Sequence, residues 1–337
     1  MFHQLGHLTV IQATSAIVRL KALADLPGYI TDEPQDGRIS GDLYGIAGDC
    51  RLAVLPTVNG ERANVRLPAL GALPDPDGLG LPQVLVSDLR AAVRRSAGLV
   101  LVCGPTGAGK TTTIHSLLRE LAAQRPDRHV LSIEDPVERR LPDVTQVEVT
   151  TRCPALACLR VALRHDPDVL VVGEIRDGET AATAVRSALT GHLVVATLHI
   201  GRAVEAVPRL IDLGVAVDLL LPSLVAVSAQ RLIRLIHPAC AGAGCGGCAG
   251  GFLGRRAVAD FIAVDGEARS AWRSGRSPAL THGRNHRRCT RLWIGRGMAS
   301  GATPSGAGTG QGVAGDVPRR VMVPWMIVPP CSPPCGR

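Results

Sequence analysis

Short apolar runs alternate with longer segments of mixed polarity through the middle of the chain. A run that is apolar on both faces is typical of a strand in a parallel sheet that helices cover on both sides. The alternation of such strands with segments of helical length predicts an α/β fold. The runs are Leu99–Cys103, His129–Ile133, Val169–Val172 and Leu193–Ala196, and the helical segments are 110–123, 155–164 and 178–190.

The regions on either side of this pattern differ from it. Residues 1–26 repeat apolar side chains at helical spacing, and Arg51–Pro56 and Ala63–Leu67 are predicted as two strands joined by the turn Thr57–Gly60. The Pro- and Gly-rich stretch 71–82 is a natural boundary. We expect a partial α+β N-terminal domain over 1–70, a linker over 71–82, an α/β domain over 83–235, a Cys-rich insertion over 236–254, a C-terminal helical remnant over 255–280 and a low-complexity, disordered tail over 281–337.

The net charge of +8 is concentrated in the last quarter of the chain. Residues 251–337 hold 13 Arg and 4 acidic residues, so they carry a net +9 and the preceding 250 residues carry −1. A nucleic-acid-binding protein is expected to carry its positive charge as a patch on a folded face. The near-neutral charge of the motif-bearing part therefore argues against direct binding of nucleic acid.

The distribution of apolar residues predicts no transmembrane segment. The longest strongly apolar stretch without a charge, Leu219–Gln230, is shorter than the roughly 20 residues that a bilayer requires, and Met1–Val10 lacks the features of a signal peptide. These observations favour a cytosolic location. In that reducing compartment we expect the 10 Cys to be thiols or metal ligands rather than disulfides.

Residues 104–111, Gly-Pro-Thr-Gly-Ala-Gly-Lys-Thr, match the phosphate-loop pattern G-x-x-x-x-G-K-[ST]. The glycines allow backbone N–H groups to face a phosphate, Lys110 is suited to the β- and γ-phosphates, and Thr111 offers a hydroxyl to Mg²⁺. The alternative is a chance glycine-rich turn, but the motif follows an apolar strand and precedes a helical segment, as a true site requires. The candidate nucleotide-binding residues are Gly104, Pro105, Thr106, Gly107, Ala108, Gly109, Lys110, Thr111 and Thr112.

Carboxylates follow two of the predicted strands. Glu134 and Glu138 come after His129–Ile133, and Glu174 comes after Val169–Val172, so all lie where open α/β sheets bind their ligands. Glu174 is the candidate metal-proximal carboxylate, with Thr111, and any of the three is a candidate to position the attacking water. Solvated loop charges are the alternative for each, and we expect Asp177 to cap a helix.

Two histidines, His192 and His199, flank the predicted strand Leu193–Ala196. A lone His in such a place is more often structural. Two of them beside a nucleotide site are candidates for sensing the γ-phosphate, and the sequence leaves both interpretations open.

A series of motifs in order along the chain resembles the secretion ATPase family of the GspE/PulE/PilB type. This family includes the type II secretion motor, the type IV pilus extension motor and the DNA-uptake ATPase. The motifs are Pro34–Arg38, the arginine-bearing hairpin from Arg51 to Arg66, Gly104–Thr113, Ser132–Glu138, Asp166–Asp177, Thr190–His199 and Ala229–Leu232. The segment that follows Val169–Val172 departs from the common form of a Walker B strand, because Gly173 stands where an Asp is common.

The resemblance implies a RecA-like P-loop NTPase domain with a PAS-like N-terminal domain, assembled as a homo-hexameric ring. It implies that Arg51 and Arg66 reach the γ-phosphate when the two domains close, and that Mg·ATP is the cofactor. It further implies a cytoplasmic motor that joins an inner-membrane platform or adaptor protein. Without the resemblance, the two arginines would be assigned to a solvated strand edge.

Four potential metal ligands lie close together in the Cys-rich insertion. They are His237, Cys240, Cys245 and Cys248, and their x-x, four, x-x spacing can place four ligands tetrahedrally around Zn²⁺. The resemblance adds that extension-type members carry a tetracysteine site in this region, with Cys in place of His237. The site would be structural because all four positions are filled; a flexible loop without metal is the alternative.

The sequence favours Mg-dependent ATP hydrolysis that powers assembly of pilin-like filaments. Two alternatives remain: a truncated, non-catalytic nucleotide-binding subunit of such a ring, and a nucleic-acid translocase. Type II secretion, pilus extension and DNA uptake share all of these motifs, so the sequence does not distinguish between the machines.

Overall fold

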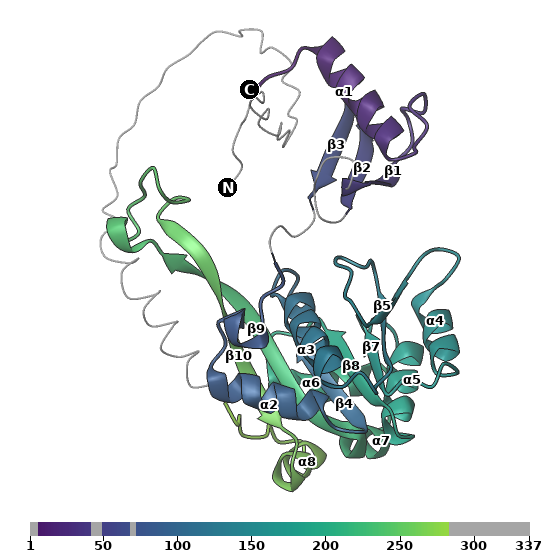
Figure 1. The fold of residues 1–337 in the computed structure, drawn as a ribbon, viewed down its shortest axis with the longest axis vertical. Coiled ribbons are helices and arrows are strands. Elements are labelled where there is room, and N and C mark those ends of the chain that lie inside the picture. Colours follow the sequence, from purple (N-terminus) through teal and green to yellow (C-terminus); the bar gives the residue numbers. More distant parts are fainter. Residues whose placement is uncertain (1–5, 42–48, 68–71, 283–337) are drawn as a thin grey trace, which may run out of the picture. The chain divides into compact units, whose positions relative to one another are not determined.

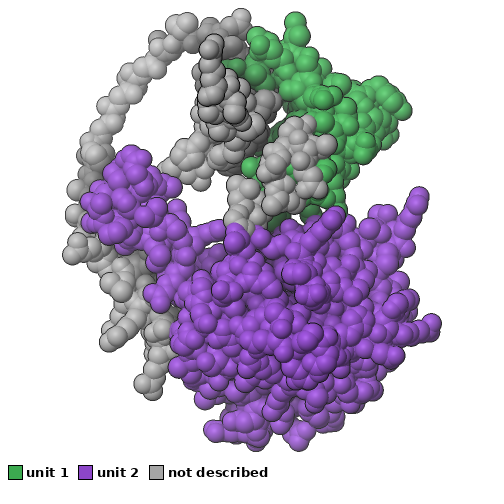
Figure 2. Space-filling view, viewed as in Figure 1, with its two compact units in different colours: residues 1–71, 303–337 green, residues 72–302 purple. Residues whose placement is uncertain are grey.

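The computed structural model describes residues 6–41, 49–67 and 72–282, which form two compact units (Figures 1 and 2). Unit 1 contains the described residues up to 67, and unit 2 begins at Ala72. The disordered tail that we expect over 281–337 lies, from residue 283 onward, outside the described residues.

Unit 1 consists of one helix packed on a three-stranded antiparallel sheet. Its elements are α1 (Val10–Leu23), β1 (Gln35–Ile39), β2 (Cys50–Thr57) and β3 (Gly60–Arg66), with the strands in sequence order across the sheet. Alternate residues of β2, Leu52 and Val54, are buried with Ile17 of α1. Thr9 caps the helix together with Gln12, as in a capping box. The predicted helix and hairpin are therefore confirmed, and β1 is an additional strand.

A buried ion pair links the helix to the hairpin of unit 1. Lys21 of α1 has no exposed side chain, and its Nζ contacts Glu61 of β3 at 2.5 Å and the carbonyl oxygen of Ile30. A buried ammonium group needs such partners, because desolvation without them is costly. The pair thus fixes the hairpin against α1.

Unit 2 is built on a seven-stranded sheet in the order β10-β9-β4-β8-β7-β5-β6. All neighbouring strands are parallel except β9 and β10, which are antiparallel. The strands are β4 (Gly98–Cys103), β5 (Val130–Glu134), β6 (Thr145–Glu148), β7 (Val169–Val172), β8 (Leu193–Leu198), β9 (Leu224–Ile236) and β10 (Phe252–Ala263). The helices are α2 (Gln83–Val93), α3 (Lys110–Gln124), α4 (Ala155–Ala162), α5 (Gly178–Leu189), α6 (Ala206–Asp212), α7 (Val217–Ser223) and α8 (Gly266–Arg273).

Helices cover both faces of the central strands. Along β4, Leu99 and Leu101 pack into the apolar cluster that α4 to α8 form, whereas Val100 and Val102 pack into the cluster of α2 and α3. Successive side chains of a strand point to opposite faces, so a strand covered on both sides must be apolar throughout. This confirms the predicted α/β fold and all four predicted strands.

The sheet extends further along the chain than the sequence predicts. Residues 255–263, expected to belong to a helical remnant over 255–280, form most of β10, and only Gly266–Arg273 of that segment is helical. Ala257 and Phe261 of β10 are buried in the apolar cluster of α2 and α3, and Ile262 is buried in the cluster on the other face of the sheet. Only Ala257–Ala263 of this segment is mainly apolar, and short apolar runs of this kind are ambiguous between helix and strand.

Two further findings bear on the sequence predictions. Cys153 and Cys158 are joined as a disulfide, so the expectation of thiols or metal ligands alone is wrong for this pair. Within the described residues, none of the helices combines the length and the apolar character needed to cross a bilayer.

Candidate functional site

The phosphate loop connects β4 to α3 and depends on glycine for its path. Gly104, Gly107 and Gly109 have φ angles of 148°, 75° and 87°, which favour glycine. A β-carbon on Gly104 would lie 2.4 Å from the carbonyl oxygen of Gln230. Helix α3 begins at Lys110 with Gly109 as its N-cap, so no side chain caps its first turn. The N–H groups of that turn and the helix dipole are therefore suited to an anion.

Lys110 is buried and turns back toward its own loop. Its Nζ donates hydrogen bonds to the carbonyl oxygens of Gly104 at 2.7 Å and Pro105 at 3.2 Å. Burial lowers the pKa of Lys110, and the negative charge of Glu174 partly opposes this change. The ammonium group is thus held beside the loop that it would serve.

Gln230 of β9 is a residue of this site that the sequence did not single out by itself. Its Nε2 donates a 2.8 Å hydrogen bond to the carbonyl oxygen of Ala108, and its side chain is buried. Its Oε1 has no hydrogen-bond partner within the described part of the chain. The only sequence signal was its place in the motif Ala229–Leu232.

A cavity of about 90 Å³ lies beside Thr111, at the carboxyl ends of the parallel strands. As predicted, it brings the acidic residues that follow β5 and β7 together with the phosphate-loop threonine. It is lined by Thr111, Ile114, His115, Glu134, Asp135, Pro136, Glu138, Val171, Gly173, Glu174 and Thr197.

Glu174 has a polar partner at each carboxylate oxygen. Arg176 Nε lies 2.7 Å from Oε2, and His199 Nε2 lies 3.0 Å from Oε1. Arg176 Nη1 also contacts Asp135 Oδ2 at 2.9 Å. Gly173 precedes this network because a β-carbon there would lie 2.8 Å from the carbonyl oxygen of Ile133. This close approach accounts for glycine at a position where the common form of a Walker B strand has Asp.

Glu134 is hydrogen-bonded like Glu174, but it is buried, whereas Glu174 is partly exposed. Its carboxylate accepts from Ser132 Oγ at 2.7 Å and Gln146 Nε2 at 2.9 Å, and lies 2.9 Å from His115 Nε2. Burial acts to raise the pKa of Glu134, but the three partners, with His115 foremost, hold it below its usual value. Glu138, in contrast, is exposed at the cavity. Glu134 therefore fits a supporting role better than contact with a reacting water.

The two histidines lie at opposite ends of β8. His199 follows the carboxyl end of the strand and contacts Glu174. His192 precedes the amino end, where its Nδ1 lies 3.2 Å from the carbonyl oxygen of Ser187. Six strand residues span about 20 Å, so His192 cannot reach the phosphate-loop edge of the sheet. This position favours the structural interpretation of His192 over sensing of the γ-phosphate at the phosphate loop of the same chain.

Arg51 and Arg66 lie in unit 1, and the phosphate loop lies in unit 2. They are directly opposite each other on β2 and β3, and Arg38 of β1 is opposite Arg51 on the other side. All three are exposed on the face away from α1. Like charges facing each other across strands are destabilising. Such a row is suited to an anion, and the approach of Arg51 and Arg66 to a γ-phosphate stays a prediction.

The Cys-rich insertion connects β9 to β10 at the tip of a two-stranded arm that extends beyond the rest of unit 2 (Figure 1). One ligand atom from each of His237, Cys240, Cys245 and Cys248 lies within 4.8 Å of the others. The Cys245–Cys248 and Cys240–Cys248 Sγ distances are both 3.7 Å. A tetrahedral Zn²⁺ with bonds of about 2.3 Å requires sulfur separations of about 3.8 Å. The four residues therefore fit zinc.

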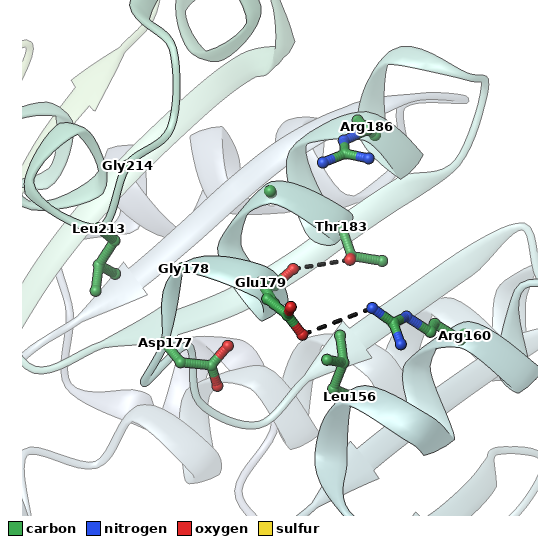
Figure 3. Close-up of a pocket in the computed structure, with 10 residues that line it drawn as sticks. Leu156, Arg160, Asp177, Gly178, Glu179, Thr183, Arg186, Leu213 and Gly214 are labelled. Carbon is green, nitrogen blue, oxygen red and sulfur yellow. Dashed lines mark hydrogen bonds and ion pairs between the residues drawn. The ribbon is translucent and has the colours of Figure 1, made fainter.

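A separate hollow of about 890 Å³ lies between α4, α5 and the loop at Leu213 and Gly214. Figure 3 shows Arg160 reaching toward Glu179, with 3.6 Å between Nη2 and Oε2. Asp177 lies at the same place and accepts from the Thr180 N–H at 2.8 Å, which confirms it as the N-cap of α5. None of the predicted nucleotide-binding or metal-binding residues lines this hollow.

The fold and the site together define a RecA-like P-loop NTPase. Its phosphate loop follows β4, its acidic residues follow β5 and β7, and β8 separates β4 from β7 in the sheet. Ligands of open α/β sheets bind at this edge.

The chain belongs to the family described as type II/IV secretion system protein, whose sequence profile matches residues 3–305. It is 40% identical over 274 residues to type II secretion system protein HxcR of Pseudomonas aeruginosa, covering 77% of this chain and 58% of the relative. It is 37% identical over 275 residues to the type IV pilus assembly ATPase PilB of Thermus thermophilus, covering 72% of this chain and 31% of that protein. The chain thus spans little more than half of the length of HxcR and about a third of the length of PilB.

Solved structures agree with this assignment. The pilus retraction motor PilT, determined with bound ADP, matches with a TM-score of 0.60 and 30% identity, covering 77% of this chain and 71% of that one. The ATPase DotB of Legionella pneumophila shares the fold, with a TM-score of 0.55 and 24% identity, over 74% of this chain and 66% of its own.

Proposed function

We propose that this chain binds Mg·ATP and hydrolyses it to power the assembly of pilin-like filaments, in type II secretion or type IV pilus extension. The observation that carries the proposal is the meeting of Thr111, Glu174 and Lys110 at one edge of the sheet. The names of the relatives support the choice of machine.

The donor set beside Thr111 fits magnesium. A hydroxyl and a carboxylate oxygen from Glu174 line one cavity, and Mg²⁺ prefers oxygen ligands. When bound, the ion would neutralise charge on the β- and γ-phosphates. Lys110 and the N-terminal turn of α3 bind the same phosphates, and Glu174 or the exposed Glu138 orients water for in-line attack. Buried Glu134 fixes the end of β5 against α3 through its contact with His115.

His199 and unit 1 supply the coupling in this proposal. His199 contacts Glu174, so a change at the γ-phosphate reaches β8 through that carboxylate. Arg51 and Arg66 close over the γ-phosphate, since guanidinium groups stay charged and bind oxygens in a fork. Loss of the γ-phosphate removes the ligand that favours closure, and the units reopen.

Family membership supports a proposal for the wider assembly. We propose a homo-hexameric ring on the cytoplasmic side, joined to an inner-membrane platform or adaptor protein, with no direct contact to nucleic acid. His237, Cys240, Cys245 and Cys248 would hold a structural Zn²⁺ that stiffens the arm.

The proposal is tested by ATP turnover of the purified chain and its Lys110→Ala and Glu174→Gln variants. Both variants are expected to lose turnover, while Arg160→Gln, which removes an exposed charge outside the site, keeps it. Turnover equal to the parent in both site variants would contradict the proposal. Retained Mg·ATP binding without turnover in the parent would instead favour the non-catalytic subunit.

A further inference from the structure

Arg176 links two carboxylates that follow neighbouring parallel strands. Its Nε lies 2.7 Å from Glu174 Oε2, and its Nη1 lies 2.9 Å from Asp135 Oδ2. Asp135 follows β5 and Glu174 follows β7, and these strands are paired. Two such carboxylates repel each other, and the guanidinium neutralises that repulsion with a fork suited to two oxygens.

This arrangement leaves Glu174 with neither oxygen unengaged. Arg176 holds Oε2 and His199 lies beside Oε1. Glu174 is the carboxylate that the proposed function assigns to the divalent cation, with the hydroxyl of Thr111. Each carboxylate oxygen keeps a further lone pair, so a cation can still reach Glu174, but it then lies beside the positive charge of Arg176 unless the guanidinium moves away.

The guanidinium is the partner that can move. The side chain of Arg176 is 61% exposed, whereas that of His199, the other partner of Glu174, is 40% exposed. Exposed ion pairs contribute little to stability, so breaking one costs little. Asp135 is also exposed and provides a second attachment, so Arg176 can leave Glu174 without leaving the site.

We propose that Arg176 is a positioning residue with an exchangeable bond to Glu174, which competes with a divalent cation in the absence of nucleotide and gives way when the cation arrives with a triphosphate. A cation alone must bind beside the positive charge of Arg176, or displace it, while gaining few ligands. A cation bound to a triphosphate brings phosphate oxygens to the phosphate loop and Lys110, and these added contacts offset the lost bond. This inference rests on the proposed function for the identity of the ligand.

The test is binding of Mn²⁺ alone to the full chain, followed by electron paramagnetic resonance of the free ion. Arg176→Gln removes the competing charge, and we expect it to bind Mn²⁺ about threefold to fivefold more tightly than the parent, as the loss of an exposed ion pair allows. Arg176→Lys keeps the charge but loses the fork, so its gain should be smaller. Arg160→Gln is the matched control and should bind as the parent does.

The double variant Arg176→Gln/Glu174→Gln locates the effect. The gain should disappear in it if the cation binds at Glu174. No gain in Arg176→Gln, a gain that survives in the double variant, or an equal gain in Arg160→Gln would each overturn the inference. Circular dichroism verifies folding. If Arg176→Gln does not fold, the Mn²⁺ affinity of Arg176→Lys is the test: a gain over the parent supports the inference, and no gain overturns it.

Binding of Mn·ATP to the parent chain distinguishes a failure of the proposed function from a failure of the role proposed for Arg176. If the parent fails to bind Mn·ATP, the proposed function itself is wrong. If the parent binds Mn·ATP and Arg176→Gln shows no gain for Mn²⁺ alone, only the role of Arg176 is wrong.

Discussion

The side chain of Gln230 donates a 2.8 Å hydrogen bond to the carbonyl oxygen of Ala108, which lies 122 residues earlier in the chain. The bond connects β9 to the phosphate loop at Ala108, the residue before its third glycine, Gly109. The loop therefore owes its shape to a distant strand as well as to its own glycines.

Replacing Gln230 by Ala should weaken Mg·ATP binding, because the carbonyl of Ala108 loses its donor and the loop loses its support. A buried acceptor left without a partner costs about 1–3 kcal/mol, so we expect roughly tenfold weaker binding by calorimetry. Gln124→Ala is the control, since Gln124 makes an exposed side-chain contact with Arg94. Unchanged affinity in Gln230→Ala would remove this residue from the site.

Gly104 should not tolerate even a methyl group. Its φ of 148° disfavours a side chain, and the added β-carbon would lie 2.4 Å from the carbonyl oxygen of Gln230. We expect Gly104→Ala to lower the free energy of unfolding by more than about 2 kcal/mol in urea titrations. Gly266→Ala is the control, because open space surrounds that glycine. Equal stability of the two variants would show that the loop relaxes around the clash.

Acid should weaken unit 2 through Glu134. The pKa of this carboxyl is below its ordinary value of 4.5 in the folded chain, where His115, Gln146 and Ser132 outweigh the effect of burial. Its contribution is therefore complete above about pH 4.5 and is lost as the pH falls through the lowered folded-state pKa. Glu134→Gln should show a shallower decrease of unfolding free energy below pH 4.5. Parallel pH profiles for parent and variant would contradict the assignment.

The Cys-rich insertion should hold one Zn²⁺ per chain. Cys245→Ser removes one of four ligands and should reduce the zinc content measured by mass spectrometry to near zero. Mg·ATP binding should persist, because the insertion lies at the tip of the β9–β10 arm and not at the phosphate loop. Cys50→Ala, in unit 1, should keep the metal. A purified parent chain that contains no zinc after expression in zinc-supplemented medium would contradict the site.

The sequence predicts those parts of the fold that depend on local pattern. The strand Leu99–Cys103 is apolar throughout because it is covered on both faces, and the loop after it has a specific spacing. The β9–β10 hairpin is not predictable in this way. Its outer part, including Leu235 and Ile236, is exposed, so the residues show no simple alternation of buried and exposed positions.

The contacts of the site depend on how distant strands come together. The pairs Glu134–His115 and Asp135–Arg176 join residues 19 and 41 positions apart, and only the sheet brings them into contact. Strand direction also separates what the sequence places together. His192 and His199 flank β8, so they lie at opposite ends of that strand, and only His199 lies at the end where the phosphate loop is found.

The central claim is that backbone N–H groups, Lys110 and a carboxylate from a nearby strand bind a magnesium triphosphate. Isothermal titration of the folded full chain with Mg·ATP tests it most directly. The account predicts saturable binding at one site per chain, weakened at least tenfold in Lys110→Ala and unaffected in Arg160→Gln. Heat signals indistinguishable from dilution, for a parent chain with a cooperative unfolding transition, would contradict it.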